Sequence, residues 1–233
     1  MSPVLPPPVV LGIDTAGPVV GAALWLGDAA GPAWSQRVVR GADAVLLPAV
    51  DDLLAELAER GLHLDRVAVT VGPGAFTGLR VGVATALGIA LARGIPVVPV
   101  GALLARAAMV GEGDDVLALL DARKGRVYAG RFAVHDAWPT RRAPAVDGCL
   151  AEALPPGAFL AVGEGARVFA AAILAAGGQV VPQADACPAP AVARLGARLP
   201  ALDPGEIALR YLRDADAVPP SDLGQRVGQP APR

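Results

Sequence analysis

Short apolar runs and helix-spaced apolar stripes alternate along the first half of the chain. The short runs are bounded by glycine, proline or polar residues and predict strands over residues 9–14, 19–26, 33–40, 67–71 and 95–100. Apolar positions three and four apart predict a helix over 44–61, with Asp43 as its N-cap and Gly61 as its end. Two more helices are expected, one ending at Gly94 and one over 102–109.

The second half mixes strands and helices again. Strands are expected on both sides of a turn at Lys124 and Gly125, and further strands over 141–146, 159–162 and 179–182. Helices are expected over 150–154, 168–176 and 189–199. Beyond Arg213 the sequence is polar and rich in proline, so we expect disorder there. Each half opens with a hairpin, yet no residue-level repeat relates the two. The pattern predicts an α/β protein with mixed sheets flanked by helices.

The helix that ends at Gly94 carries an unusual stripe of small residues. Four of them recur every four positions and share one face: Gly78, Gly82, Ala86 and Ala90. A bulky stripe on the same helix consists of Phe76, Leu79, Val83 and Leu87. Each glycine inside a helix costs about 1 kcal/mol relative to alanine, so the bare face needs a close neighbour. The neighbour is either a partner helix or the protein's own sheet.

Two glycine turns are candidate phosphate contacts. Gly72 and Gly74 precede the glycine helix, whose free backbone N–H groups could hold an anion. The spacing matches neither the dinucleotide fingerprint nor the P-loop. Asp14 and Thr15 end the first strand just before a hairpin turn. A tight strand-to-helix turn and a capped hairpin are the simpler interpretations of the two sites.

Charge and composition limit the classes of function. The formal net charge is -2, so the chain has no domain-wide basic footprint for tight binding to nucleic acid. Asp121, Arg123, Lys124 and Arg126 gather at one turn, where a solvated hairpin with an internal ion pair is favoured over an anion or RNA contact. The apolar stretch 81–100 is interrupted by Arg93, Gly94 and Pro96, which argues against a membrane span, and we expect a cytoplasmic protein.

Residues for metal or nucleophilic chemistry are sparse. His63 and His135 have no second His or Cys at metal-ligand spacing, and no Ser–His–Asp or Cys–His set can be assembled with any specificity. Cys149 and Cys187 are the only cysteines and are expected to be unpaired thiols. We therefore expect no metal, no catalytic residues and no cofactor on this chain.

Four segments carry a resemblance to a known family. They read GIDTA at 12–16, GPGAFTGLRVGVATALGIA at 72–90, IPVVPVGALLARA at 95–107 and LLDARKGRVYAG at 119–130. Together they resemble the bacterial TsaB family, also called YeaZ, and IALRYLR at 207–213 is similar to the family's C-terminal end. The central motif departs in one position, because Ala75 stands where the family usually has Ser. Ala42 and Asp43 stand where family members often carry His-Ser, so the role of that position stays open.

The resemblance implies an actin-like fold of two related lobes, in the superfamily of the Hsp70 ATPase and sugar kinases. It implies an N-terminal lobe over 1–110 that carries the partner-binding helices, a C-terminal lobe over 111–213, and a disordered tail over 214–233. In actin-like proteins, an Asp before a glycine hairpin, as at Asp14, works through a metal at bound phosphates. The rival interpretations are an active small-molecule kinase or a metallopeptidase-like member of the superfamily.

The resemblance also implies a function. TsaB-like proteins are non-catalytic partners of a paralogue, TsaD, in the formation of threonylcarbamoyladenosine next to the tRNA anticodon. A TsaE-like ATPase joins them, tRNA is met only through the complex, and the chain also forms homodimers. ATP or ADP is then expected at the interface of the complex rather than on this subunit.

The resemblance also implies which residues face the partner protein. The expected partner-facing set is Leu46, Leu47, Val50, Leu54, Phe76, Leu79, Arg80, Val83 and Leu87. The close-packing set, Gly78, Gly82 and Ala86, is expected to face the helix over 44–61 of the same chain. The edge with Leu79 and Val83 would then face the partner.

Overall fold

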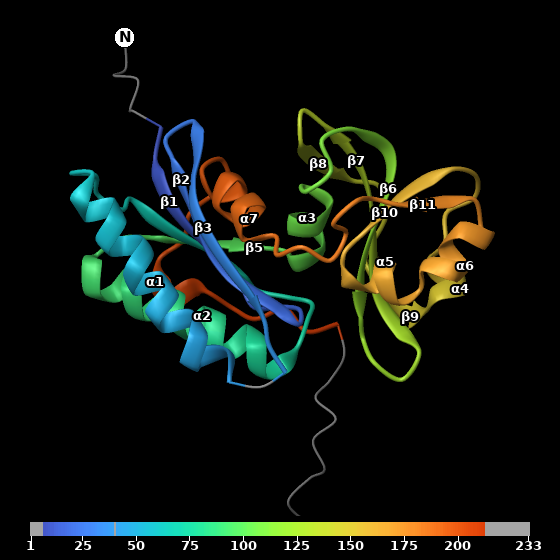
Figure 1. The fold of residues 1–233 in the computed structure, drawn as a ribbon, viewed down its shortest axis with the longest axis horizontal. Coiled ribbons are helices and arrows are strands. Elements are labelled where there is room, and N and C mark those ends of the chain that lie inside the picture. The colour runs from blue at the N-terminus through green and yellow to red at the C-terminus, as the bar shows by residue number, and fades with distance from the viewer. Residues whose placement is uncertain (1–6, 40, 213–233) are drawn as a thin grey trace, which may run out of the picture.

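A computed structural model describes residues 7–39 and 41–212 and shows two mixed β-sheets side by side, flanked by helices (Figure 1). This confirms the expected fold class. The first sheet has the strand order β3-β2-β1-β4-β5. Its strands are β1 (Val9–Asp14), β2 (Val19–Leu26), β3 (Ala29–Arg37), β4 (Arg66–Thr70) and β5 (Val97–Val100). The bounds predicted for the first two strands are confirmed to the residue.

The second sheet has the order β11-β10-β6-β7-β8, and β9 pairs with β7 beside it. Its strands are β6 (Gly113–Asp121), β7 (Arg126–His135), β8 (Trp138–Arg141), β9 (Val146–Cys149), β10 (Phe159–Val162) and β11 (Gly178–Val180). The strand expected over 141–146 was wrong, since most of this segment is the connection between β8 and β9.

The two sheets repeat one topology. In the first, β3, β2 and β1 are antiparallel neighbours, and β4 and β5 continue from β1 in parallel. In the second, β8, β7 and β6 are antiparallel, and β10 and β11 continue from β6 in parallel. The structure therefore confirms two related lobes, although the sequence shows no repeat.

One face of the first sheet is covered by α1 (Ala42–Glu59) and α2 (Phe76–Arg93) (Figure 1). Leu46, Val50 and Leu53 of α1 pack there against the strand residues Leu11, Ile13, Val67 and Val69. The prediction that Asp43 caps α1 was wrong. Gly41 takes the N-cap position in a left-handed conformation with φ 73°, and Asp43 lies in the first turn.

The last helix of each half packs on the other half's sheet. Helix α3 (Ala102–Ala107) follows β5, yet Leu103 and Ala107 pack against β6 and β7. Helix α7 (Ala189–Gly196) follows β11, yet Val192 and Leu195 pack against the first sheet. The predicted boundary between the lobes at residue 110 stays a prediction. Helix α7, which that boundary assigns to the C-terminal lobe, packs on the sheet of the N-terminal lobe.

The remaining short elements lie in the second half: α4 (Leu150–Ala153), α5 (Glu164–Val168), α6 (Ala170–Ala175) and the 3-10 turn Pro204–Glu206. After α7 the chain runs back along the first lobe, where Leu202 bridges Val97 and the Arg210 N–H donates to the Val71 carbonyl. The tail predicted to be disordered, 214–233, lies outside the described residues.

Within the described ranges, α2 is the one helix whose length and apolarity would let it cross a membrane. Leu79, Val83 and Ala86 of this helix are buried, and Val83 and Ala86 pack on the first sheet. A helix packed in the core of a protein can be as long and as apolar as a membrane span, so these two properties alone do not indicate one.

Candidate functional site

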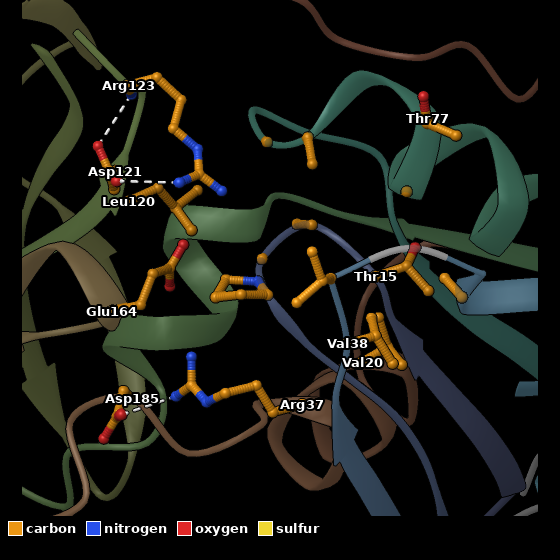
Figure 2. Close-up of a pocket in the computed structure, with 18 of the residues that line it drawn as sticks. Thr15, Val20, Arg37, Val38, Thr77, Leu120, Asp121, Arg123, Glu164 and Asp185 are labelled. Atoms are coloured by element: carbon orange, nitrogen blue, oxygen red, sulfur yellow. Dashed lines mark hydrogen bonds and ion pairs between the residues drawn. The ribbon is translucent and has the colours of Figure 1, made fainter. Parts of the chain in front are cut away.

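A cleft of about 760 Å³ lies between the lobes (Figure 2). The first lobe lines it with the turn after β1, the end of β3 and the start of α2, and the second lobe with the β6–β7 turn, α5 and the loop after β11. Polar, charged and glycine residues that line the cleft include Thr15, Gly17, Arg37, Gly74, Asp121, Arg123, Glu164, Arg167 and Asp185.

The four predicted phosphate contacts divide into two pairs. Thr15 and Gly74 line the cleft, whereas Asp14 and Gly72 do not. An added Cβ at Gly72 would clash with the Arg210 carbonyl, so the bare backbone there serves close packing of the C-terminal segment. Asp14 is fully buried behind the cleft.

An ion network joins the lobes at the base of the cleft. Arg106 on α3 lies with one guanidinium nitrogen 3.4 Å from Asp14 at the end of β1, and another 3.2 Å from Glu164 at the start of α5. Arg106 also donates to the Ala102 carbonyl. Arg106 and Asp14 are both almost fully buried, and the Glu164 side chain is 12% exposed.

Burial and mutual attraction oppose each other in this network. Burial alone would lower the pKa of Arg106, but Asp14 and Glu164 raise it above its usual range, so the guanidinium stays charged. Burial raises the pKa of Glu164, and Arg106 counteracts only part of that shift. The Arg106 guanidinium therefore compensates the negative charge of two carboxylates, Asp14 and Glu164.

The cleft does not fit a nucleotide held through a metal at Asp14. A divalent cation needs carboxylate oxygens that face it, but the Asp14 oxygens face the Arg106 guanidinium. Glu164 sits among the cleft-lining residues and points toward the cavity in Figure 2, where its carboxylate would repel phosphate oxygens. In the described part of the chain, no group of three or more His, Cys, Asp or Glu residues could hold a metal.

Charged pairs also line the rim of the cleft. Arg37 of β3 donates to Asp185 at 2.9 Å, and Arg167 approaches the same carboxylate at 3.7 Å, so Asp185 links the two lobes (Figure 2). On the opposite side, Asp121 accepts a hydrogen bond from the Arg123 backbone N–H at 2.8 Å. Arg126 pairs with Asp147 at 3.0 Å. The Arg123 guanidinium also lies 3.8 Å from Asp121, so the hairpin contains the expected internal ion pair. That the hairpin makes no anion or RNA contact stays a prediction.

The two cysteines are unpaired, as expected. Cys149 is exposed, and burial raises the pKa of Cys187 to about 12, which leaves that thiol protonated and unreactive.

A second, shallower groove of about 460 Å³ runs between α1 and α2 on the outer side of the helix pair. Its lining surface is mostly apolar, and the residues that form it are Asp43, Leu47, Val81, Ala84, Thr85, Gly88 and Ile89. Leu47 is 54% exposed, and a Cβ at Gly88 would meet no atom within 4 Å. The groove is therefore open to another molecule.

Several predicted interface residues were wrong, because they are buried in the core. Leu46, Val50, Leu79 and Val83 are at most 7% exposed. Leu47, Phe76 and Arg80 are exposed, and Leu54 and Leu87 are half-buried. Helical spacing identified two stripes correctly but could not say which one faces the sheet.

The expected contact of the glycine face with α1 was also wrong. An added Cβ would come closer than 3.0 Å to the Thr15 carbonyl oxygen at Gly78 and to the Thr15 hydroxyl at Gly82. The small face therefore packs against the turn after β1, within the same lobe. Ala86 is fully buried on that inner side, whereas Gly88 is the glycine that faces outward.

Sequence reasoning missed Arg106 and Glu164, the two residues that complete the base of the cleft. They are 58 positions apart, and Arg106 lies 92 positions from Asp14. The available signal was local: Arg106 is the single charge in an apolar helix segment, ALLARAA, where a lone buried cation requires a carboxylate partner.

Comparisons with known proteins agree with this architecture. Residues 38–176 match the family model described as TsaD: tRNA N6-adenosine threonylcarbamoyltransferase. The chain is 36% identical over 126 residues to the tRNA threonylcarbamoyladenosine biosynthesis protein TsaB of Escherichia coli K12, covering 53% of this chain and 54% of that protein. It is 32% identical over 124 residues to TsaB of Bacillus subtilis 168, covering 53% and 54%.

The chain thus spans about half the length of the curated relatives it matches. The solved structure of YeaZ from Pseudomonas aeruginosa superposes with a TM-score of 0.69 at 24% identity, covering 88% of this chain and 100% of that one, which shows a shared fold. The curated relatives that this chain matches over about half of their length are named TsaB. Because the family model matches more than half of this chain's residues, the chain belongs to the family described as TsaD: tRNA N6-adenosine threonylcarbamoyltransferase.

Proposed function

We propose that this chain is a non-catalytic subunit in tRNA threonylcarbamoyladenosine biosynthesis, which binds and activates a TsaD-like paralogue. The catalytic transfer then belongs to the paralogue, and tRNA meets this chain only through the complex. A TsaE-like ATPase joins the assembly, ATP or ADP binds at its interface, and the free chain forms homodimers. We place the complex in the cytoplasm.

The groove between α1 and α2 is the observation that supports this proposal most. Ala84, Gly88 and Leu47 line it, and a Cβ at Gly88 would meet no atom within 4 Å, so a partner helix can approach the backbone closely there. An apolar groove on a covering helix pair is typical of helix docking. The exposed Leu91, 69% accessible, continues the apolar surface toward the end of α2.

The base of the cleft supports the non-catalytic part. Asp14, the residue best placed to work through a metal, is paired with Arg106. Glu164, the nearest cleft carboxylate, is bonded to the same guanidinium. Neither is free to act as a metal ligand or a general base while that pairing holds.

The test compares two leucine variants of the full chain. Leu47 lies in the groove at 54% exposure, and Leu174 lies on α6 of the other lobe at 61%, so Leu174→Glu is a matched control for Leu47→Glu. Affinity for the TsaD-like paralogue of the same organism is measured by isothermal titration. A charge in an apolar interface should weaken binding about tenfold or more. Leu174→Glu should bind like the wild type.

Activity is measured in the same preparations. Threonylcarbamoyl transfer to tRNA should require both proteins and should fall with Leu47→Glu in proportion to the lost complex. Turnover by this chain alone would overturn the non-catalytic role. Equal affinities of the Leu47→Glu and Leu174→Glu variants would overturn the interface.

A further inference from the structure

Arg106 is the most deeply buried cation in the described part of the chain, at 2% exposure. It projects from α3, the helix that packs between the two sheets (Figure 1). Its two carboxylate partners come from different lobes, Asp14 from the end of β1 and Glu164 from the start of α5. A single side chain therefore connects both lobes through charge.

The surrounding backbone is shaped for this network. An added Cβ at Gly17, in the turn after β1, would lie 2.8 Å from Arg106 Nη2 and 3.0 Å from Glu164 Oε1. At Gly163, just before Glu164, φ is +100° and an added Cβ would clash with the Leu119 carbonyl, so this glycine fixes the turn that leads into Glu164. Gly17 thus leaves room for the Arg106 and Glu164 side chains, and Gly163 shapes the backbone turn that presents Glu164 to Arg106.

Charge compensation is the reason why the network matters. Isolated buried carboxylates are costly, and removing one partner of a buried ion network is strongly destabilising because the remaining charges lose their compensation. Asp14 and Glu164 have no other cationic partner among the ion pairs of the described residues. Without Arg106, the two carboxylates would face each other across the lobes.

We propose that Arg106 is a built-in cation that holds the two lobes together, in a position that Asp14 and Glu164 would otherwise offer to a divalent metal ion. Glu164 accepts from Nε of the guanidinium and Asp14 from Nη1 and Nη2, and carboxylate oxygens are the ligands that Mg²⁺, Mn²⁺ and Ca²⁺ prefer. The wild-type chain then has no use for a metal at this point. Removing Arg106 uncovers a metal site at the joint.

The experiment uses four forms of the full chain: wild type, Arg106→Met, Arg106→Lys and the uncharged triple variant Asp14→Asn/Arg106→Met/Glu164→Gln. Met keeps most of the apolar volume of Arg without its charge, and Lys keeps the charge without the planar fork. Thermal unfolding is followed with EDTA and with millimolar MgCl₂, MnCl₂ or CaCl₂, and metal binding is measured by isothermal titration.

Arg106→Met should lower the midpoint of unfolding by about 10 °C in EDTA, from the cost of uncompensated carboxylates in a protein of this size. A divalent cation at about ten times its Kd should return about 4 °C of that loss. Arg106→Lys should lose less, and the triple variant should recover most of the loss. The wild type and the triple variant should not respond to metal.

Three results would overturn the proposal. The first is an Arg106→Met protein as stable as the wild type. The second is a triple variant as unstable as Arg106→Met, which would assign the loss to packing instead of charge. The third is an Arg106→Met protein that shows no binding of any of the three metals. If Arg106→Met does not fold in EDTA, the Arg106→Lys and triple variants still decide between charge and packing.

Discussion

Three glycines of α2 offer a graded test of how the helix packs. Gly78, Gly82 and Gly88 lie in one helix but meet different surroundings. A methyl group at Gly88 would point into open space, at Gly82 it would press on the Thr15 side chain, and at Gly78 on the Thr15 backbone carbonyl. Substitution of each by alanine changes the same atoms, so only the surroundings differ.

The expected magnitudes follow from two opposing effects. Alanine gains about 1 kcal/mol over glycine in a helix interior, so Gly88→Ala should stabilise the protein by about that amount. Overpacking costs about 1–3 kcal/mol. Thr15 is fully buried and β-branched, with a stiff χ1, so it cannot turn away easily. Gly82→Ala should therefore lose about 1 kcal/mol net, and Gly78→Ala about 2, since a backbone carbonyl yields even less.

Urea denaturation followed by circular dichroism measures the three free energies of unfolding. A rescue variant isolates the contact: Thr15→Ala removes the side chain that Gly82→Ala would strike. The Thr15 hydroxyl has no hydrogen-bond partner in the described structure, so its removal breaks no bond. The double variant Thr15→Ala/Gly82→Ala should show a coupling of about 1 kcal/mol or more.

Two outcomes would refute this reasoning. A Gly82→Ala protein as stable as Gly88→Ala would mean that the inner face of α2 is not closely packed. Independent effects of Thr15→Ala and Gly82→Ala would mean that the loss arises elsewhere.

Three further predictions address charge. Burial raises the pKa of Glu164 above its ordinary value of 4.5, so the folded state holds this proton to higher pH, and the free energy of unfolding should fall as pH rises through the folded pKa. Glu164→Gln removes the titrating group and should flatten this decline in denaturation curves from pH 5 to 8. An unchanged slope would contradict the prediction. Arg37→Ala breaks an exposed ion pair and should change stability by less than about 1 kcal/mol, so a larger loss in the same assay would show that the rim holds the lobes together. The isolated chain should bind tRNA weakly at physiological salt, because Arg123 and Arg126 already pair with carboxylates. Submicromolar tRNA binding that is lost in Arg123→Ala/Arg126→Ala would contradict this prediction.

Much of the fold could be predicted from local patterns. The strands β1, β2 and β10 and the end of α2 at Gly94 match the bounds expected from apolar runs and glycine punctuation. The start of β3 was missed, because Gly31 and Pro32 are typical of a turn. This strand lies at the edge of the sheet, where a proline is tolerated.

Contacts between distant segments could not be predicted from the sequence, for a physical reason. Hydrophobic spacing identifies the faces of a helix, but it cannot tell which face meets a sheet, so buried Leu79 and Val83 were assigned to an interface. The shared topology of the lobes rests on backbone pairing, which many different side chains satisfy. The two carboxylate partners of Arg106 come from segments far away in the chain, and no local pattern connects them.

Helices α3 and α7 each pack on the sheet of the other lobe, and this arrangement explains why the Arg106 ion network and the α1–α2 groove lie in different parts of the molecule. Because α7 covers one face of the first sheet and α1 and α2 cover the other, the first sheet has no free face left. A partner that approaches one of these faces must then dock on the outside of a covering helix, and the α1–α2 groove is such a place. The same arrangement puts α3 between the sheets, where Arg106 reaches both lobes. Docking at the groove and ion pairing at the joint therefore lie on different surfaces, so variants at Leu47 and at Arg106 should act independently.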